Sequence, residues 1–275
     1  MAHTQASLLE EQTLDELFDL TFRVGPLMEG ERMPGRKKAA AGLVMRLMDE
    51  TPDLPLLLLG WERAEALAAA MPVKGPRGEE NEHLVAFRDE FRSEALSRGL
   101  ALLRMLGLAW RDRHSWHVLP KARTMLRNRK TLRVLMEIAD VAEGLFLETV
   151  NLYGAAPMET VENAVRTLMK AYAPADGENV PQDILDLVMD LGPRRCGPDT
   201  LYFPDGEEGG VWFCSPWCLN PHDLWEANRD AADWYVPRED ELTWTQDSIP
   251  MDKARAGAFL DEAAAAPAAG GRSAW

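Results

Sequence analysis

Three cysteines and one histidine gather in a short segment near the end of the chain. The segment CGPDTLYFPDGEEGGVWFCSPWCLNPH, residues 196–222, contains every cysteine of the protein. Thiolate and imidazole are ligands that structural zinc prefers, and four of them complete a tetrahedral site. A turn within the segment could bring its first cysteine back towards the second. The candidate ligands are Cys196, Cys214, Cys218 and His222.

The spacing of these residues argues against a common zinc motif. The pattern is C-x17-C-x3-C-x3-H, whereas zinc ribbons use C-x2-C pairs whose tight turn points two thiolates at one metal. Pro216 and Pro221 further restrict the backbone. Cysteine is also among the most buried residue types as a small hydrophobic side chain. The sequence therefore favours buried thiols and no cofactor, with a zinc site as the alternative. The chain contains no C-x-x-C motif, so we do not expect it to catalyse disulfide exchange.

One segment of an acidic chain is strongly basic. The net charge of the protein is -15, yet residues 101–135 contain nine Lys or Arg and a single Asp. Lys and Arg neutralise phosphates without reading sequence, so the segment could bind nucleic acid or an acidic partner. It could equally dock onto acids of its own chain. The candidate binding residues are Arg104, Arg111, Arg113, Lys121, Arg123, Arg127, Arg129, Lys130 and Arg133.

The same segment carries a pattern of known type. The string GLALLRMLGLAWRDRHSWHVLPKARTMLRN ends a helix with a Leu-Gly-Leu step, continues into two short strands and enters a new helix after Pro120. In this it resembles the closing part of a winged-helix domain, over about residues 97–128, as found in uncharacterised bacterial proteins. The resemblance implies a two-stranded wing with Arg111, Asp112 and Arg113 at its tip. Winged helices of this kind often bind DNA, through the helix before the wing and through wing arginines.

The preceding helix departs from a DNA-reading pattern. Residues 82–96 show no short turn before a reading helix, and the exposed positions there include Glu94 beside Arg92 and Arg98. An acid on the reading face repels phosphate. We therefore expect contacts to phosphates or to protein rather than readout of bases.

The elements around these residues indicate a mainly α protein. We expect a multi-helical body over 8–192 that contains the winged-helix-like region, about 82–128. A Trp-rich, acidic C-terminal arm over 196–262 carries a second small β-hairpin, and 263–275 is a flexible tail. Capping patterns place helix starts at Thr13, with Glu16 three residues on, and at Asn220. Further expectations are a turn at YGAAP, residues 153–157, and a helix over 182–191 closed by Gly192.

The remaining patterns exclude several functions. The chain lacks the phosphate-binding, dinucleotide-binding, nucleophile-elbow and zinc-protease motifs, so we expect no enzyme. It has no apolar run of about 20 residues, so we expect no membrane span. The N-terminus does not look like a signal peptide, and three cysteines do not make a secreted disulfide framework, so we expect a cytoplasmic protein. The leading hypothesis is a non-enzymatic binding protein or regulator with a protein partner, self-association or nucleic acid. The alternative is a zinc-stabilised structural or interaction protein.

Overall fold

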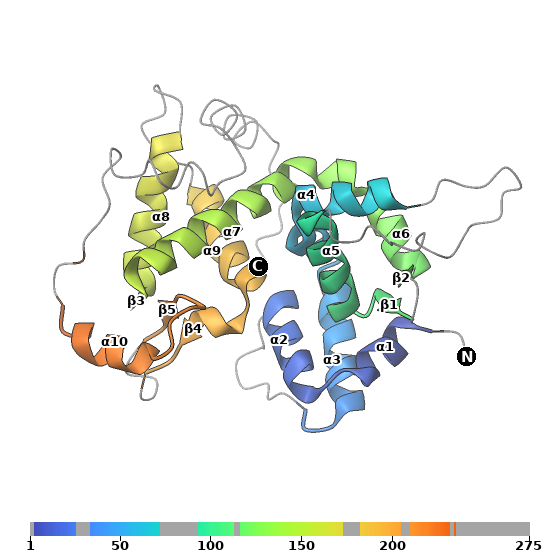
Figure 1. Cartoon of the computed structure of the whole chain (residues 1–275), viewed down its shortest axis with the longest axis horizontal. Coiled ribbons are helices and arrows are strands. Elements are labelled where there is room, and N and C mark those ends of the chain that lie inside the picture. The colour runs from blue at the N-terminus through green and yellow to red at the C-terminus, as the bar shows by residue number, and fades with distance from the viewer. Residues whose placement is uncertain are drawn as a thin grey trace, which may run out of the picture. The chain divides into compact units, whose positions relative to one another are not determined.

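The computed structural model describes residues 3–25, 34–71, 93–112, 116–172, 182–204, 210–231 and 234. Within these residues the chain is mainly helical with two small antiparallel sheets, which confirms the predicted fold class. The chain forms two compact units, Met1–Glu137 and Ile138–Trp275, whose elements are labelled in Figure 1. The expected tail, most of the expected arm beyond 234, and residues 82–92 lie outside the described residues.

Unit 1 consists of helices and one hairpin. Its helices form pairs along the chain, with α2 packed on α3 and α4 packed on α5. The hairpin pairs β1 with β2 in antiparallel fashion and follows α5 directly. The elements are α1 (Gln5–Glu11), α2 (Leu14–Val24), α3 (Lys37–Glu50), α4 (Leu54–Ala70), α5 (Glu94–Met105), β1 (Ala109–Arg111), β2 (Trp116–Val118), α6 (Pro120–Arg127), η2 (Arg129–Leu132) and the first turn of α7 (Arg133–Tyr153).

The helix starts of unit 1 follow from local side-chain chemistry. Thr13 Oγ1 accepts a hydrogen bond from the backbone N–H of Glu16, and Glu16 Oε2 accepts one from the backbone N–H of Thr13. This reciprocal pair confirms the predicted capping box and satisfies two donors that a helix start leaves unpaired. From there Leu17, Leu20 and Val24 recur at helical spacing and are fully buried.

Unit 2 combines helices with a three-stranded sheet. Its strand order is β3-β5-β4, with both pairs antiparallel, so the first strand of the unit lies beside the last. The hairpin β4–β5 was predicted, and Asn220 caps the following helix as expected. The elements are α7 from residue 138, β3 (Ala155–Pro157), α8 (Met158–Tyr172), α9 (Gln182–Cys196), η3 (Pro198–Thr200), β4 (Leu201–Tyr202), β5 (Trp212–Cys214) and α10 (Pro221–Asn228).

The two faces of this sheet are covered by different elements. Phe213 of β5 makes an edge-to-face contact with Phe146 of α7, with ring centroids 4.9 Å apart. Its neighbours Trp212 and Cys214 point the other way and pack against Leu224 and Trp225 of α10. Figure 1 shows the sheet between α10 and the helices α7, α8 and α9. Successive side chains of β5 therefore point to opposite faces of the sheet, so this one strand contributes to the core on both faces.

The expectation of a simple turn at residues 153–157 was wrong. Only Gly154, at φ +71°, makes a turn, and residues 155–157 form strand β3. Ala155 and Ala156 are buried and pair with Cys214 and Phe213. Two alanines have little strand propensity of their own, so the strand depends on a partner almost 60 residues away in the chain.

The expected end of a helix at Gly192 was also wrong. Helix α9 continues through Gly192 and Pro193 to Cys196. The reason is the tethering of its last turn, where Arg194 bonds to Asp190 at 2.8 Å and Arg195 lies between two carboxylates of α7. The Arg195 side chain is 1% exposed. A buried charge of this kind requires partners, and these partners hold the turn in place.

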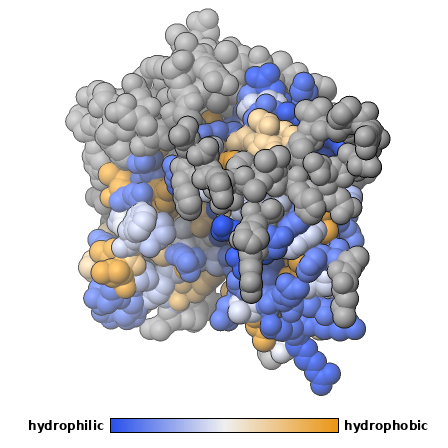
Figure 2. Space-filling model, turned by 45° about the vertical axis from the view of Figure 1, so that its right-hand side comes forward, coloured by the Kyte–Doolittle hydropathy of each residue, from blue (hydrophilic) through white to orange (hydrophobic). Residues whose placement is uncertain are grey.

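The face of the molecule seen in Figure 2 is mostly polar where its residues are described. Figure 2 shows hydrophilic residues over most of the visible described surface, with small, separate hydrophobic areas. Trp217 and Leu219, in the loop after β5, are 80% and 101% exposed. Within the described part of the chain, no helix combines the length and the apolar character needed to cross a bilayer.

The close approach of α9 to α7 gives a stability prediction. A Cβ at Gly192 would lie 2.6 Å from Phe146 Cβ, whereas a Cβ at Gly42 of α3 would have no atom within 4 Å. Gly192→Ala should therefore lower the free energy of unfolding by about 1–3 kcal/mol through overpacking. Gly42→Ala should leave it unchanged or raise it by up to about 1 kcal/mol, because alanine favours a helix interior. Thermal and urea unfolding of both variants, monitored by circular dichroism, measures the two free energies of unfolding. Equal stability of the two variants would contradict the prediction.

Candidate functional site

The hairpin of unit 1 is set in place by a tight turn after α5. Gly107 has φ +66°, and a Cβ there would lie 2.8 Å from Leu9 Cγ and 3.1 Å from the carbonyl oxygen of Gln5. Both the backbone angle and the contact require glycine. The Leu-Gly-Leu step recognised in the sequence is thus the point where the chain turns against α1 and enters β1.

Aromatic and charged side chains brace this hairpin. Trp110 and His117 are opposite each other in the strand register and stack with ring centroids 4.8 Å apart. His117 Nε2 lies 2.7 Å from Asp112 Oδ2. On the next rung Arg111 lies over the ring of Trp116, 5.8 Å from its centroid. Arg113, the third residue of the predicted wing tip, lies outside the described residues.

Lys121, Arg129 and Arg133 face carboxylates of their own unit. Two of them also lie over Trp61, with guanidinium carbons 5.9 and 5.2 Å from the ring centroid. These cations hold α6, η2 and the start of α7 to the rest of unit 1. The ion pairs are Lys121–Asp49 at 3.1 Å, Arg129–Glu65 at 2.5 Å and Arg133–Glu137 at 2.9 Å.

The other described cations are placed differently. Arg104, Arg123 and Lys130 make no ion pair with any residue that the structure describes. Arg104 and Lys130 are exposed, as are Arg111 and Arg127, and Arg123 is half-buried. Arg123, Arg127 and Lys130 follow one another along α6 and η2. The sequence between residues 113 and 136 contains no Asp or Glu, so only other segments can neutralise them.

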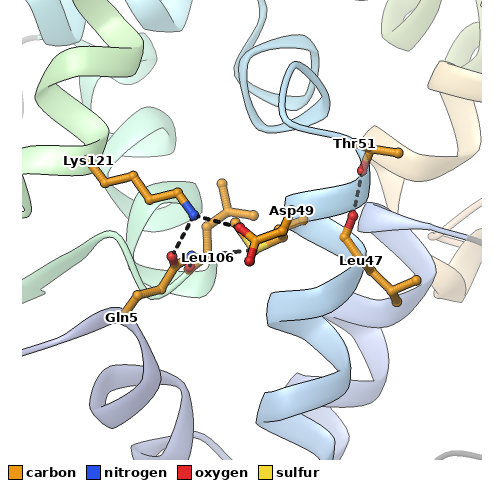
Figure 3. A network of polar contacts seen from close by, with 7 residues as sticks. Gln5, Leu47, Asp49, Thr51, Leu106 and Lys121 are labelled. Atoms are coloured by element: carbon orange, nitrogen blue, oxygen red, sulfur yellow. Dashed lines mark hydrogen bonds and ion pairs between the residues drawn. The ribbon is translucent and has the colours of Figure 1, made fainter.

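A buried amide connects this basic segment to the N-terminal helix. Gln5 Nε2 donates to the carbonyl oxygen of Leu106 at 3.0 Å, and its Oε1 accepts from Lys121 Nζ at 3.1 Å. Lys121 donates at the same time to Asp49, as Figure 3 shows. The sequence analysis assigned Lys121 to binding, whereas its ammonium group joins α1, α3 and α6.

Similarity to known proteins gives no information about the role of these residues. Comparisons with models of protein families, with curated proteins and with solved structures find no match.

The cysteine segment does not form a metal site in the described residues. No group of three or more His, Cys, Asp or Glu side chains among them is placed to hold a metal ion. Cys214 lies in β5, and its thiol donates to the carbonyl oxygen of Asp199 at 3.3 Å. His222 is engaged through Nδ1 with the hydroxyl of Tyr202 at 2.7 Å. Cys196, at the end of α9, and Cys218, in the loop after β5, form no disulfide with each other or with Cys214.

Burial changes the chemistry of one thiol. Desolvation raises the pKa of Cys214 to about 11, and the neighbouring Cys218 and Asp199 act in the same direction. A thiol with so high a pKa is a poor metal ligand and a poor nucleophile near neutral pH, because both roles require the thiolate.

A pocket in unit 1 was not anticipated from the sequence. It has a volume of about 510 Å³ and lies between α1, α2, α5 and β1. The sequence analysis named Arg104 and Arg111 as candidate binding residues and Glu16 as part of a capping box. Neither pattern indicated a pocket that brings them together. The polar side chains that line the pocket include Glu11, Gln12, Glu16, Asp19, Arg104 and Arg111.

The buried amide gives a prediction about the basic segment. Gln5→Ala leaves the buried carbonyl oxygen of Leu106 without its donor, so the free energy of unfolding should fall by about 1–3 kcal/mol. Lys121→Ala breaks an ion pair whose lysine side chain is 55% exposed, so the loss should stay below about 1 kcal/mol. Urea unfolding of both variants measures the two losses in the free energy of unfolding. A larger loss for Lys121→Ala than for Gln5→Ala would contradict the role assigned to Gln5.

The raised pKa of Cys214 predicts selective alkylation. At about pH 8 only about one Cys214 in a thousand carries the thiolate that reacts with iodoacetamide. Native protein should therefore be alkylated at Cys218 well before Cys214, as mass spectrometry of peptides would show. The Cys214 rate should rise about tenfold per pH unit up to about pH 11. Equal rates at the two cysteines in native protein would contradict this, and urea-denatured protein is the control.

Proposed function

We propose that this chain is a non-enzymatic binding protein that contacts nucleic-acid phosphates through unit 1. The contact surface consists of the hairpin together with Arg123 on α6 and Lys130 on η2. The observation that carries the proposal is the set of basic side chains left without a carboxylate in a segment that contains no acid. Arg123 and Lys130 belong to this set.

The arrangement supports binding to the backbone rather than to bases. At the start of α5 the exposed Glu94 pairs with Arg98 at 2.6 Å, which leaves an acid where a reading helix would approach the groove. Contacts to phosphates alone position a protein without sequence preference. The hairpin–helix surface thus fits a duplex or a single strand through electrostatics, and its affinity should depend strongly on salt.

We infer that unit 2 is a second winged-helix-like module with a different surface. Its order of helix, strand, two helices and hairpin, with the first strand beside the last, is typical of winged helices. The helix before its hairpin, α9, has its two described arginines bound to carboxylates. Residues 138–275 contain 9 Lys or Arg and 25 Asp or Glu, against 21 and 20 in residues 1–137. Nucleic acid therefore fits unit 1 and not unit 2.

The proposal is tested by the salt dependence of binding. The full chain should bind a labelled duplex of about 20 base pairs at about 20 mM salt and release it as salt rises. Lys130→Gln and Arg123→Gln should each weaken binding and reduce the slope of log K against log salt by about 1. Fluorescence anisotropy over a salt series measures both quantities.

Lys121→Gln is the matched control, because it removes the same charge from the same helix. Its ammonium group is already held by Asp49 and Gln5, so duplex affinity should change little. Absence of duplex binding by the full chain at low salt would overturn the proposal. An equal loss for Lys121→Gln and Lys130→Gln would show a response to net charge and overturn the surface assigned above.

A further inference from the structure

The pocket of unit 1 contains neither Arg123 nor Lys130, the two cations on which the proposed phosphate-binding surface rests. It lies between α1, α2, α5 and β1, and its volume of about 510 Å³ is in the range of small-molecule sites. It combines side chains of both charges with the indole of Trp110. The side chains that already have partners limit what the pocket could bind.

Most of the charged groups around the pocket are already satisfied. The backbone N–H of Thr13 donates to Glu16, which lowers the pKa of Glu16 below its usual value. Arg104 contributes to the same shift by its positive charge. The remaining satisfied groups are Asp19, paired with Arg23 at 2.9 Å, Asp112, paired with His117 at 2.7 Å, and Arg111, over the ring of Trp116.

Three polar groups of the lining are left over. Arg104 and Glu11 are exposed and form no ion pair with the residues that the structure describes. The third is Gln12, whose Nε2 donates to the carbonyl oxygen of Met105 at 2.7 Å. Its Oε1 is buried and accepts no hydrogen bond from the described part of the chain. A buried acceptor without a donor is unusual in folded proteins and calls for an explanation such as a bound group.

We propose that this pocket binds a small zwitterion of the free amino-acid class. The ligand carboxylate pairs with the guanidinium of Arg104, and its ammonium group pairs with the Glu11 carboxylate. The ammonium group also donates to Gln12 Oε1 once the Gln12 side chain rotates towards the pocket, because that oxygen is buried in the structure. A simple anion would lie among the carboxylates of Glu11, Glu16 and Asp19. A simple cation would lie beside two guanidinium groups. Only a ligand with both charges satisfies all three remaining groups.

An occupant would also touch the hairpin. Trp110 and Arg111 belong to β1 and line the pocket, whereas Glu11 and Gln12 lie at the end of α1. The ligand would therefore join α1 and α5 to the strand that leads into the hairpin.

The test is a thermal-shift screen of the full chain with the proteinogenic amino acids, followed by calorimetric titration of those that raise the melting temperature. At least one should bind. Arg104→Gln should weaken that binding by at least about tenfold, because it removes a charge-assisted hydrogen bond. Arg98→Gln is the matched control on the same helix, since Arg98 is 60% exposed, pairs with Glu94 and does not line the pocket.

Two analogues of the bound amino acid test the need for both charges. The amine that lacks the carboxylate and the acid that lacks the amino group should each bind at least about tenfold more weakly than the amino acid. The proposal is overturned if no amino acid binds, if Arg98→Gln weakens binding as much as Arg104→Gln, or if either analogue binds as tightly. Lys130→Gln should leave amino-acid binding unchanged, so the outcome is separate from that of duplex binding.

Discussion

The architecture of unit 1 depends on one buried amide, the side chain of Gln5. Its two polar atoms bond to the carbonyl oxygen of Leu106 and to the ammonium group of Lys121, and Nε2 also lies 3.5 Å from Met48 Sδ. A buried amide requires partners for its donors and its acceptor, so it fixes α1 against three other parts of the unit. The turn at Gly107 packs against the backbone of the same residue. The start of the hairpin, the start of α6 and one wall of the pocket all follow from this contact.

A second constraint is the neutralisation of the basic segment. Because residues 113–136 contain no acid, each ion pair there must come from another part of the chain. Asp49 of α3, Glu65 of α4 and Glu137 of α7 supply three. Among them only the Lys121–Asp49 pair is exposed on both sides, and such a pair contributes little stability. All three use cations that could otherwise meet a partner. Folding thus divides the segment into cations that position α6 and η2 and cations that remain available.

The sequence was informative where the determining interaction is local. The reciprocal cap of Thr13 with Glu16 and the cap at Asn220 depend on residues three positions apart, and both were predicted correctly. Strand β3 was missed because two alanines become a strand only beside β5. The extension of α9 past Gly192 was missed because Arg195 finds its carboxylates on α7. The pairing of Lys121 with Asp49, and the pocket beside Arg104, likewise join residues far apart in the chain. Periodicity and spacing contain no information about such contacts.

The unequal charges of the two units shape any interaction with a polyanion. Residues 138–275 have 16 more acids than basic residues, whereas residues 1–137 have one more basic residue than acids. Salt screens charges beyond about 8 Å at physiological ionic strength, so under the proposed function a direct contact at Lys130 counts for more than acids that do not touch the polyanion. A lower salt concentration strengthens both the attraction of the polyanion to the cations it contacts and its repulsion by the acids of the chain. The apparent number of phosphates neutralised, read from the salt dependence, should therefore be smaller than the number of cations in contact. Under the proposed function the same balance favours unit 1, because unit 2 is acidic and the two described arginines of α9 are bound to carboxylates.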